Sequence, residues 1–242
     1  MNAIEDNPWS RAQIELGKSL SRPRAVVVVS AHWWTHGTFV QASTSPETIH
    51  DFGGFPRELF EARYPAPGNP LLAAEVATLL GGDTTPEWGL DHGAWSVLLR
   101  LFPNADVPVV QVSLDSDLSP RGHLEMGRKL AGLRDRGILL LASGTLTHNL
   151  RDAMRHSQTG DTTHPDWAER FDVDVAKMVE LRDDDALLNV HTTADGRMSH
   201  PTPDHWLPIL WSYGASDPTD SLAFPVEGFD MGSMSMRSMR WG

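Results

Sequence analysis

The sequence contains no cysteine among its 242 residues. This absence excludes disulfides, thiolate metal sites, iron–sulfur clusters and cysteine nucleophiles together. Any metal ion must therefore be held by imidazole and carboxylate groups, and the chain has 11 His and 32 Asp and Glu to supply them.

Positive charge is also scarce, because 20 Lys and Arg stand against 32 Asp and Glu and leave a formal net charge of −12. A nucleic acid or an anionic membrane surface would repel such a chain at long range, so we expect neither as a partner. No run approaches the roughly 18 to 20 apolar residues of a membrane span. Residues 1–10 lack the apolar stretch of a signal peptide. The expected location is the cytoplasm, for a monomer or a small homo-oligomer.

Several signature motifs are missing as well. No G-x-G-x-x-G follows a strand, and no G-x-x-x-x-G-K-[ST], H-E-x-x-H or G-x-S-x-G occurs. These absences disfavour nucleotide binding and serine hydrolysis.

Three apolar, β-branched runs are typical of strands buried on both faces. They are Ala25–Ser30, Val107–Leu114 and Gly137–Ser143. Between and after them, helical patterns cover residues 11–20, 70–80, 95–102, 123–134, 167–181 and 202–212, while residues 38–42 and 229–235 are weaker strand candidates. Strands that alternate with helices predict one α/β domain over residues 1–242, with a mostly parallel sheet.

Four histidines lie at or near the ends of these predicted elements: His32, His92, His148 and His205. Ligands of open α/β sheets bind beyond the carboxyl ends of the strands, so these imidazoles could converge on one pocket. The alternative is four unrelated polar caps. His50 lies in a long aromatic loop, residues 43–69, where it either faces a substrate or pins the loop.

Six further histidines lie in polar stretches or at a helix start, where a solvated side chain, or for His123 a capping or solvated one, is the simpler expectation. They are His36, His123, His156, His164, His191 and His200.

Eight motifs are spread in order through the whole chain. They are Ser30-Ala-His-Trp33, Thr48-Ile-His-Asp-Phe-Gly-Gly-Phe-Pro56, Tyr64-Pro-Ala-Pro-Gly68, Asp91-His-Gly-Ala-Trp95, Gly127-Arg-Lys-Leu130, Ala142-Ser-Gly144 with His148-Asn149, Pro201-Thr-Pro-Asp-His205 and Pro225-Val-Glu-Gly228. Together they closely resemble the class III extradiol ring-cleavage dioxygenases, in the branch of the bacterial and plant 4,5-DOPA extradiol dioxygenases.

This resemblance implies a central mixed sheet flanked by helices, and cleavage of a catechol ring with O2. It further implies one divalent metal ion, Fe(II) for activity, with Zn(II) as an ion that such a site also binds. His32 and His205 correspond to metal ligands, and His148 to an acid–base histidine close enough to act as a ligand. His92 corresponds to a second proton-handling histidine, and His50 is a candidate substrate-loop residue.

The sequence departs from the family at its start. In the family, a strand ending in His-Gly-Ser-Pro precedes the Met-Asn that here is Met1-Asn2, and its histidine is the first metal ligand. We expect the domain to lack that strand, either through an internally assigned start codon, which we favour, or as a truncated relative. Two other functions stay open: a catalytically inactive binding or scaffold relative, and a zinc-dependent hydrolase.

Overall fold

The computed structural model describes residues 2–242, and a five-stranded sheet forms its centre. The strand order is β3-β2-β4-β1-β5, with β1 parallel to both β4 and β5, and with β2 antiparallel to β4. The strands are β1 (Ala25–Thr35), β2 (Phe39–Gln41), β3 (Asp83–Thr85), β4 (Val109–Asp115) and β5 (Ile138–Ser143). The predicted α/β fold with a mixed, mostly parallel sheet is confirmed.

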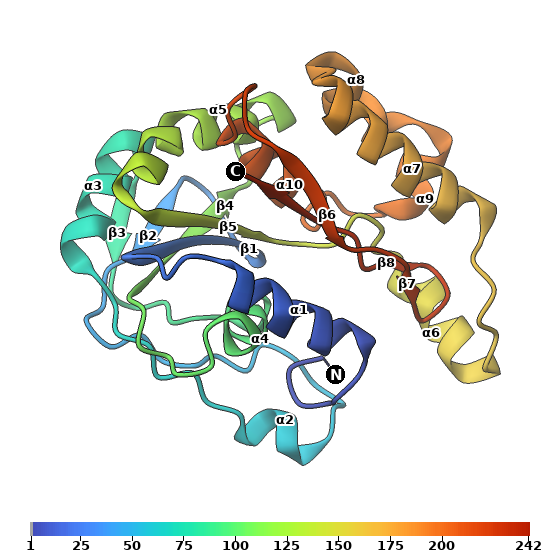
Figure 1. The fold of residues 1–242 in the computed structure, drawn as a ribbon, viewed down its shortest axis with the longest axis horizontal. Coiled ribbons are helices and arrows are strands. Elements are labelled where there is room, and N and C mark those ends of the chain that lie inside the picture. The colour runs from blue at the N-terminus through green and yellow to red at the C-terminus, as the bar shows by residue number, and fades with distance from the viewer. Residues whose placement is uncertain (1) are drawn as a thin grey trace.

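Helices cover both faces of this sheet (Figure 1). The apolar residues of β1 alternate between the two resulting cores: Val27 and Val29 belong to one, and Val26 and Val28 to the other. Helices α3 (Pro70–Leu80), α5 (Pro120–Leu130) and α10 (Leu207–Gly214) build the first core, and α4 (His92–Leu101) builds the second, with α1 (Pro8–Ser19) packed on α4. A central strand buried on both faces is the reason for its unbroken valine run.

The remaining helices are shorter or lie away from the sheet. Helix α2 (Arg57–Glu61) interrupts the long aromatic loop, and α7 (Asp166–Leu181), α8 (Asp184–Asn189) and α9 (Ala194–Ser199) form the orange group at the upper right of Figure 1. Helix α6 (Leu150–Thr159) and the 3₁₀ turns Ala131–Arg136 and Val190–Thr192 complete the set.

The strand expected over residues 229–235 is wrong. This segment is a tight hairpin of β7 (Phe229–Asp230) and β8 (Met234–Ser235), in which Met231 and Gly232 have positive φ. The closing strands are instead β6 (Leu222–Val226) and β9 (Ser238–Trp241), which pair with each other in a separate antiparallel ribbon. A turn of left-handed residues cannot continue a strand.

The outer edge of β5 borders an open groove. Among the described residues β5 pairs with β1 alone, and its Leu139, Leu140 and Leu141 are partly exposed, whereas β4 is buried throughout. Two adjoining hollows of about 410 and 450 Å³ follow this edge, lined by α1, β5, α10 and β9, and Asn2 lies at the hollow next to the carboxyl end of β5. An uncovered strand edge of this kind is unusual in folded proteins, because it leaves a row of backbone groups without partners.

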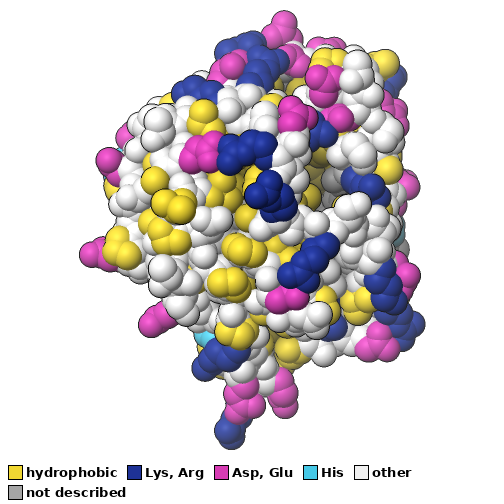
Figure 2. All heavy atoms as spheres, turned by 60° about the vertical axis from the view of Figure 1, so that its left-hand side comes forward, with side chains coloured by type: hydrophobic (Ala, Val, Ile, Leu, Met, Phe, Trp, Pro, Cys, Tyr) yellow, Lys and Arg dark blue, Asp and Glu magenta, His cyan; other side chains and the backbone are white. Residues whose placement is uncertain are grey.

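The surface is mixed in character. Figure 2 shows hydrophobic side chains that reach the surface across the middle of one face, between several Lys and Arg, with acidic side chains mostly towards its rim. Within residues 2–242 no helix is long and apolar enough to cross a membrane.

Candidate active site

The four histidines singled out by the sequence meet at one end of the sheet. His32 lies near the end of β1, and His92 is the first residue of α4. His148 follows β5 in a loop that is fixed by its backbone N–H bond to Ser199 (2.8 Å), and His205 precedes α10. Four segments distant in sequence therefore supply one cluster, and the prediction that these imidazoles converge is confirmed.

The imidazole rings form a continuous series. The ring centroids of His92 and His32 lie 3.9 Å apart, and those of His32 and His205 lie 5.0 Å apart at an interplanar angle of 88°. His205 and His148 stack face to face, with centroids 3.3 Å apart and planes inclined by 3°. Neutral imidazoles tolerate such proximity, whereas several imidazolium ions would repel one another.

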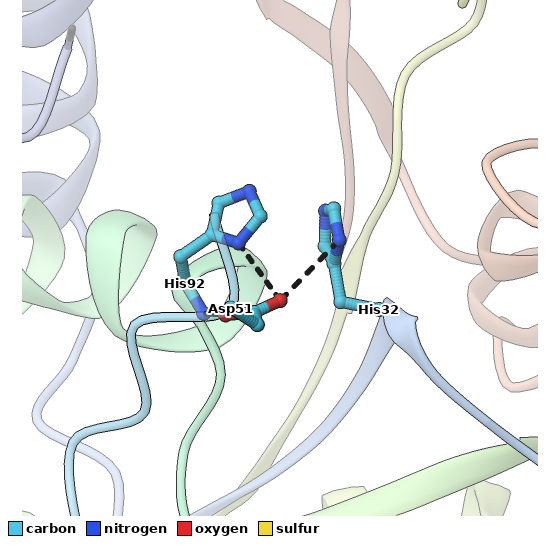
Figure 3. Close-up of side chains that lie close together, drawn as sticks. All are labelled: His32, Asp51 and His92. Atoms are coloured by element: carbon cyan, nitrogen blue, oxygen red, sulfur yellow. Dashed lines mark hydrogen bonds and ion pairs between the residues drawn. The ribbon is translucent and has the colours of Figure 1, made fainter. Parts of the chain in front are cut away.

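Two aspartates flank this series of rings. Asp51 Oδ2 lies 2.9 Å from Nδ1 of His92 and 3.5 Å from Nδ1 of His32, as Figure 3 shows. Asp204 Oδ2 lies 2.6 Å from Nδ1 of His205. A carboxylate at Nδ1 favours the tautomer that leaves Nε2 free to bind a metal ion or to take a proton. The sequence-based reasoning missed both aspartates.

Burial and mutual repulsion keep the rings of His32 and His148 neutral. Burial first, and then the neighbouring His92 and His205, lower the pKa of His32 to about 4. Burial and His205 lower the pKa of His148 to about 3. For Asp204, burial acts in the opposite direction, but the contacts with His205 and Thr202 hold the pKa of the carboxyl well below its usual value. At neutral pH the site thus combines neutral imidazoles at His32 and His148 with the ionised carboxylate of Asp204.

Helix α4 is fixed at its start by a buried cap. The side chain of Asp91 accepts the backbone N–H of Ala94 at 3.0 Å and also contacts Gln111 of β4. Burial raises the pKa of the Asp91 carboxyl, so it is not simply a solvated N-cap. Gly93 follows His92, and a Cβ there would lie 2.8 Å from Cδ2 of His32. The glycine therefore lets the start of α4 lie against the His32 ring without displacing it.

His50 lies outside the group of four clustered histidines, and Phe52 contacts both His50 and His92. Its Nε2 is 3.0 Å from the carbonyl oxygen of Ala62 and 3.2 Å from Nη1 of Arg63. The ring centroid of Phe52 lies 5.7 Å from that of His50 and 5.3 Å from that of His92. His50 thus makes contacts within the loop, and its role in substrate binding stays a prediction.

Three histidines expected to be solvated are in fact buried. His123, His156 and His200 are each less than 9% exposed. His123 Nε2 contacts the carbonyl oxygen of Asp115 at 3.1 Å, and His200 Nε2 contacts that of Leu146 at 2.7 Å. These histidines lie in polar stretches of the sequence or at a helix start, which suggested exposure to solvent. The carbonyl oxygens that they contact are brought close only by the fold.

The donor set fits a divalent metal ion. Two groups, His32–Asp51–His92 and His148–Asp204–His205, each bring three ligand atoms within 4.8 Å of one another. Imidazole nitrogen with carboxylate oxygen is the ligand chemistry of non-haem iron and of zinc. Ligands must be deprotonated to bind a metal ion, and the lowered pKa values of His32 and His148 meet that condition at neutral pH.

Comparisons with known proteins show which family this chain resembles. Residues 9–229 match the family described as the catalytic LigB subunit of aromatic ring-opening dioxygenase. A 4,5-DOPA dioxygenase extradiol from Escherichia coli K12 is 46% identical, over all of this chain and 91% of that protein. One of the same name from Beta vulgaris is 34% identical, over all of this chain and 92% of that protein. The crystal structure of an uncharacterised Escherichia coli K12 protein, 43% identical, superposes with a TM-score of 0.84 over 98% of this chain and 93% of that one.

Proposed function

The chain belongs to the family of catalytic LigB subunits of aromatic ring-opening dioxygenases, and from that premise we propose that it opens the ring of DOPA or a related catechol with O2. The observation that carries this proposal is the convergence of His32, His92, His148 and His205 from four separate segments. An inactive scaffold has no need of four imidazoles in contact, so this arrangement disfavours the inactive alternative.

In this proposal His32 and His205 hold one divalent metal ion, and His148 is the acid–base histidine that lies close enough to it to act as a further ligand. Fe(II) is the ion for activity, and Zn(II) is expected to bind the same nitrogens, because it stands above Fe(II) in the usual affinity order. When bound, the iron supplies the redox centre that the reaction of a catechol with O2 requires. The Asp204 carboxylate lies 2.6 Å from Nδ1 of His205 and fixes the orientation of that ring, with Nε2 left free for the metal ion.

Proton transfer is the task of His92 and His148. A catechol hydroxyl loses its proton on binding, and a neutral imidazole within reach accepts the proton and returns it as the ring opens. His92 lies beside His32, and His148 lies beside His205, so the two ends of the imidazole series each offer one such group. His50 is proposed as a substrate-loop residue that acts through Phe52.

Oxygen uptake tests the proposal directly. The protein is loaded with Fe(II) without air, its iron content is measured, and DOPA, caffeate or protocatechuate is added with oxygen. We expect uptake of one O2 for each catechol consumed, and loss of uptake in His205→Ala but not in His36→Ala, a matched change at a surface histidine. Iron-loaded protein that takes up no oxygen with any of the three catechols would contradict the proposal. Ester hydrolysis by the zinc form without O2 would favour the hydrolase instead.

The open edge of β5 supports a second proposal, that the family's first strand belongs in the groove beside it. The two hollows of the groove together follow β5 for its full length, and Asn2 lines the one that also includes His205. A strand that runs parallel to β5 and leads into Asn2 would deliver its final residues next to the clustered histidines. A His-Gly-Ser-Pro end to that strand would add a further imidazole to the site.

A longer form tests this strand. The in-frame codons before Met1 are translated together with the chain, and the two forms are compared. We expect the longer form to bind Zn(II) more tightly and to melt at a higher temperature, because the strand pairs with β5 and fills the groove. Equal metal affinity and equal melting temperature in the two forms would count against the proposal.

A further inference from the structure

The Asp51 carboxylate makes three contacts at the active site. Oδ1 accepts the backbone N–H of His92 at 2.8 Å. Oδ2 lies 2.9 Å from Nδ1 of the same residue and 3.5 Å from Nδ1 of His32. The Asp51 side chain is only 19% exposed, although it belongs to a loop. One carboxylate therefore spans the start of α4 and the end of β1.

The loop around Asp51 is fixed independently of these contacts. The backbone N–H of Ile49 donates to the carbonyl oxygen of Leu90 at 2.8 Å, and the N–H of Leu90 donates to the carbonyl oxygen of Glu47 at 2.7 Å. The indole N–H of the fully buried Trp95 donates to the carbonyl oxygen of Ile49 at 2.8 Å. Asp51 is thus held two residues from a backbone anchor, so its position does not depend on the imidazoles that it contacts.

The contact between Asp51 and the His92 ring joins a carboxylate oxygen to Nδ1. Nδ1 of His92 is buried and, within residues 2–242, has no well-aligned hydrogen-bond acceptor, and the oxygen that lies beside it is Asp51 Oδ2 at 2.9 Å. A buried nitrogen beside a carboxylate is more stable with its proton than without it. Figure 3 shows the second nitrogens of His92 and His32 on one side, pointing away from Asp51.

We propose that Asp51 is a positioning residue for His92, which it holds with the proton on Nδ1 and with Nε2 free on the side shared with His32. His92 can then accept a proton at Nε2. The longer 3.5 Å distance to His32 makes Asp51 a weak influence on that ring and on metal binding. The catalytic part of this inference rests on the proposed function, whereas the tautomer of His92 does not.

Asp51→Asn is the informative substitution, because the amide keeps the size of the side chain and can still accept the backbone N–H of His92. Its NH2 group would face Nδ1 and would favour the opposite tautomer, with the proton on Nε2. A merely structural role would survive this change, whereas a tautomer-setting role would not. Asp117→Asn is the matched control, because Asp117 contacts a different histidine, His36, at 3.0 Å on the surface.

Three measurements are made on each protein. Nitrogen-15 NMR of the metal-free protein reports which nitrogen of His92 carries the proton, competition with a chelator gives the affinity for Zn(II), and steady-state oxygen uptake gives kcat and KM. We expect the Nδ1–H tautomer in the wild type and in Asp117→Asn, and the Nε2–H tautomer in Asp51→Asn. We also expect kcat to fall by about 10- to 100-fold in Asp51→Asn, with Zn(II) affinity and KM nearly unchanged.

Two results would overturn the inference. A wild-type His92 with its proton on Nε2 would refute the tautomer directly, even if Asp51→Asn failed to fold. A loss of Zn(II) affinity in Asp51→Asn as large as that in His32→Ala would make Asp51 a metal ligand instead. If the wild type takes up no oxygen but the tautomer switches as expected, the proposed function fails while the role of Asp51 stands.

Discussion

A methyl group added at Gly93 should weaken metal binding without unfolding the protein. Gly93 is the second residue of α4, and a Cβ there would lie 2.8 Å from Cδ2 of His32 and would also overlap the Ser30 hydroxyl. The backbone of β1 has little room to retreat, because Val29 is paired in register with both β4 and β5, and Ser30 is paired with β5. The ring of His32 must therefore rotate away.

The size of the effect follows from the cost of that overlap. Inserting a methyl group into a packed site costs about 1–3 kcal/mol. If metal binding returns the ring to its present position, the bound state bears this cost and the affinity falls by about 5- to 150-fold. Alanine also favours a helix over glycine by about 1 kcal/mol, which offsets part of the strain in the metal-free protein and keeps its melting temperature near that of the wild type.

Titration of Gly93→Ala with Zn(II) against a competing chelator measures the affinity. Gly53→Ala is the matched control, because it lies in the neighbouring loop with a φ that is not in the left-handed region and with no atom within 4 Å of an added Cβ. We expect the control to bind Zn(II) like the wild type. A folded Gly93→Ala protein whose affinity stays within a factor of two of the wild type would show that His32 is not a ligand, or that its ring has room to spare.

Three further changes test the scaffold. Burial lowers the pKa of His123 from 6.5 to about 4, so this residue binds more protons in the unfolded chain than in the folded one between these values. Its contribution to the loss of stability between pH 7 and pH 5 is about 2 kcal/mol, and His123→Gln should reduce the pH slope in urea titrations by that amount. Gly127→Ala should lower the melting temperature by about 2–12 °C, because its Cβ would meet the backbone of α10, whereas Gly132→Ala, with open space around it, should not. Asp172→Ala should cost about 3–5 kcal/mol in a thermal melt, because it leaves the buried Arg237 guanidinium, now 2.7 Å from Asp172, with less compensation.

The well-predicted parts of the fold are those in which local signals agree with packing. Helix α3 has the predicted bounds, because Asn69 caps its start, Pro70 occupies its first turn and Gly81 ends it at a φ of 77°. The strand that begins at Ala25 was also expected, but it continues past Ser30 to Thr35, since pairing with β4 resumes after a bulge. Such an extension depends on the neighbouring strand, which the local sequence does not contain.

The missed elements depend on distant contacts. Helices α8 and α9 have only 6 residues each, too few to show a hydrophobic period, and α6 is mostly polar, with few apolar residues to mark it. The four histidines could be found because each lies near the end of a predicted element. Asp51 could not be found in this way, since its place beside His92 comes from the backbone pairing of Ile49 with Leu90, two residues 41 positions apart in sequence.

The position of the cluster explains why a sheet strand and two helix starts are needed to build it. His32 comes from β1, whose side chains enter both cores, while His92 begins the helix of one core and His205 precedes the helix of the other. The imidazole series therefore crosses the end of the sheet from one layer to the other. A shift of either helix against β1 would separate the rings, so the packing of both cores is what holds the ring distances of 3.9 and 5.0 Å on either side of His32. The close glycine contacts at Gly93 and Gly127 serve this arrangement, because each lets a helix backbone approach its neighbour more closely than a side chain would allow.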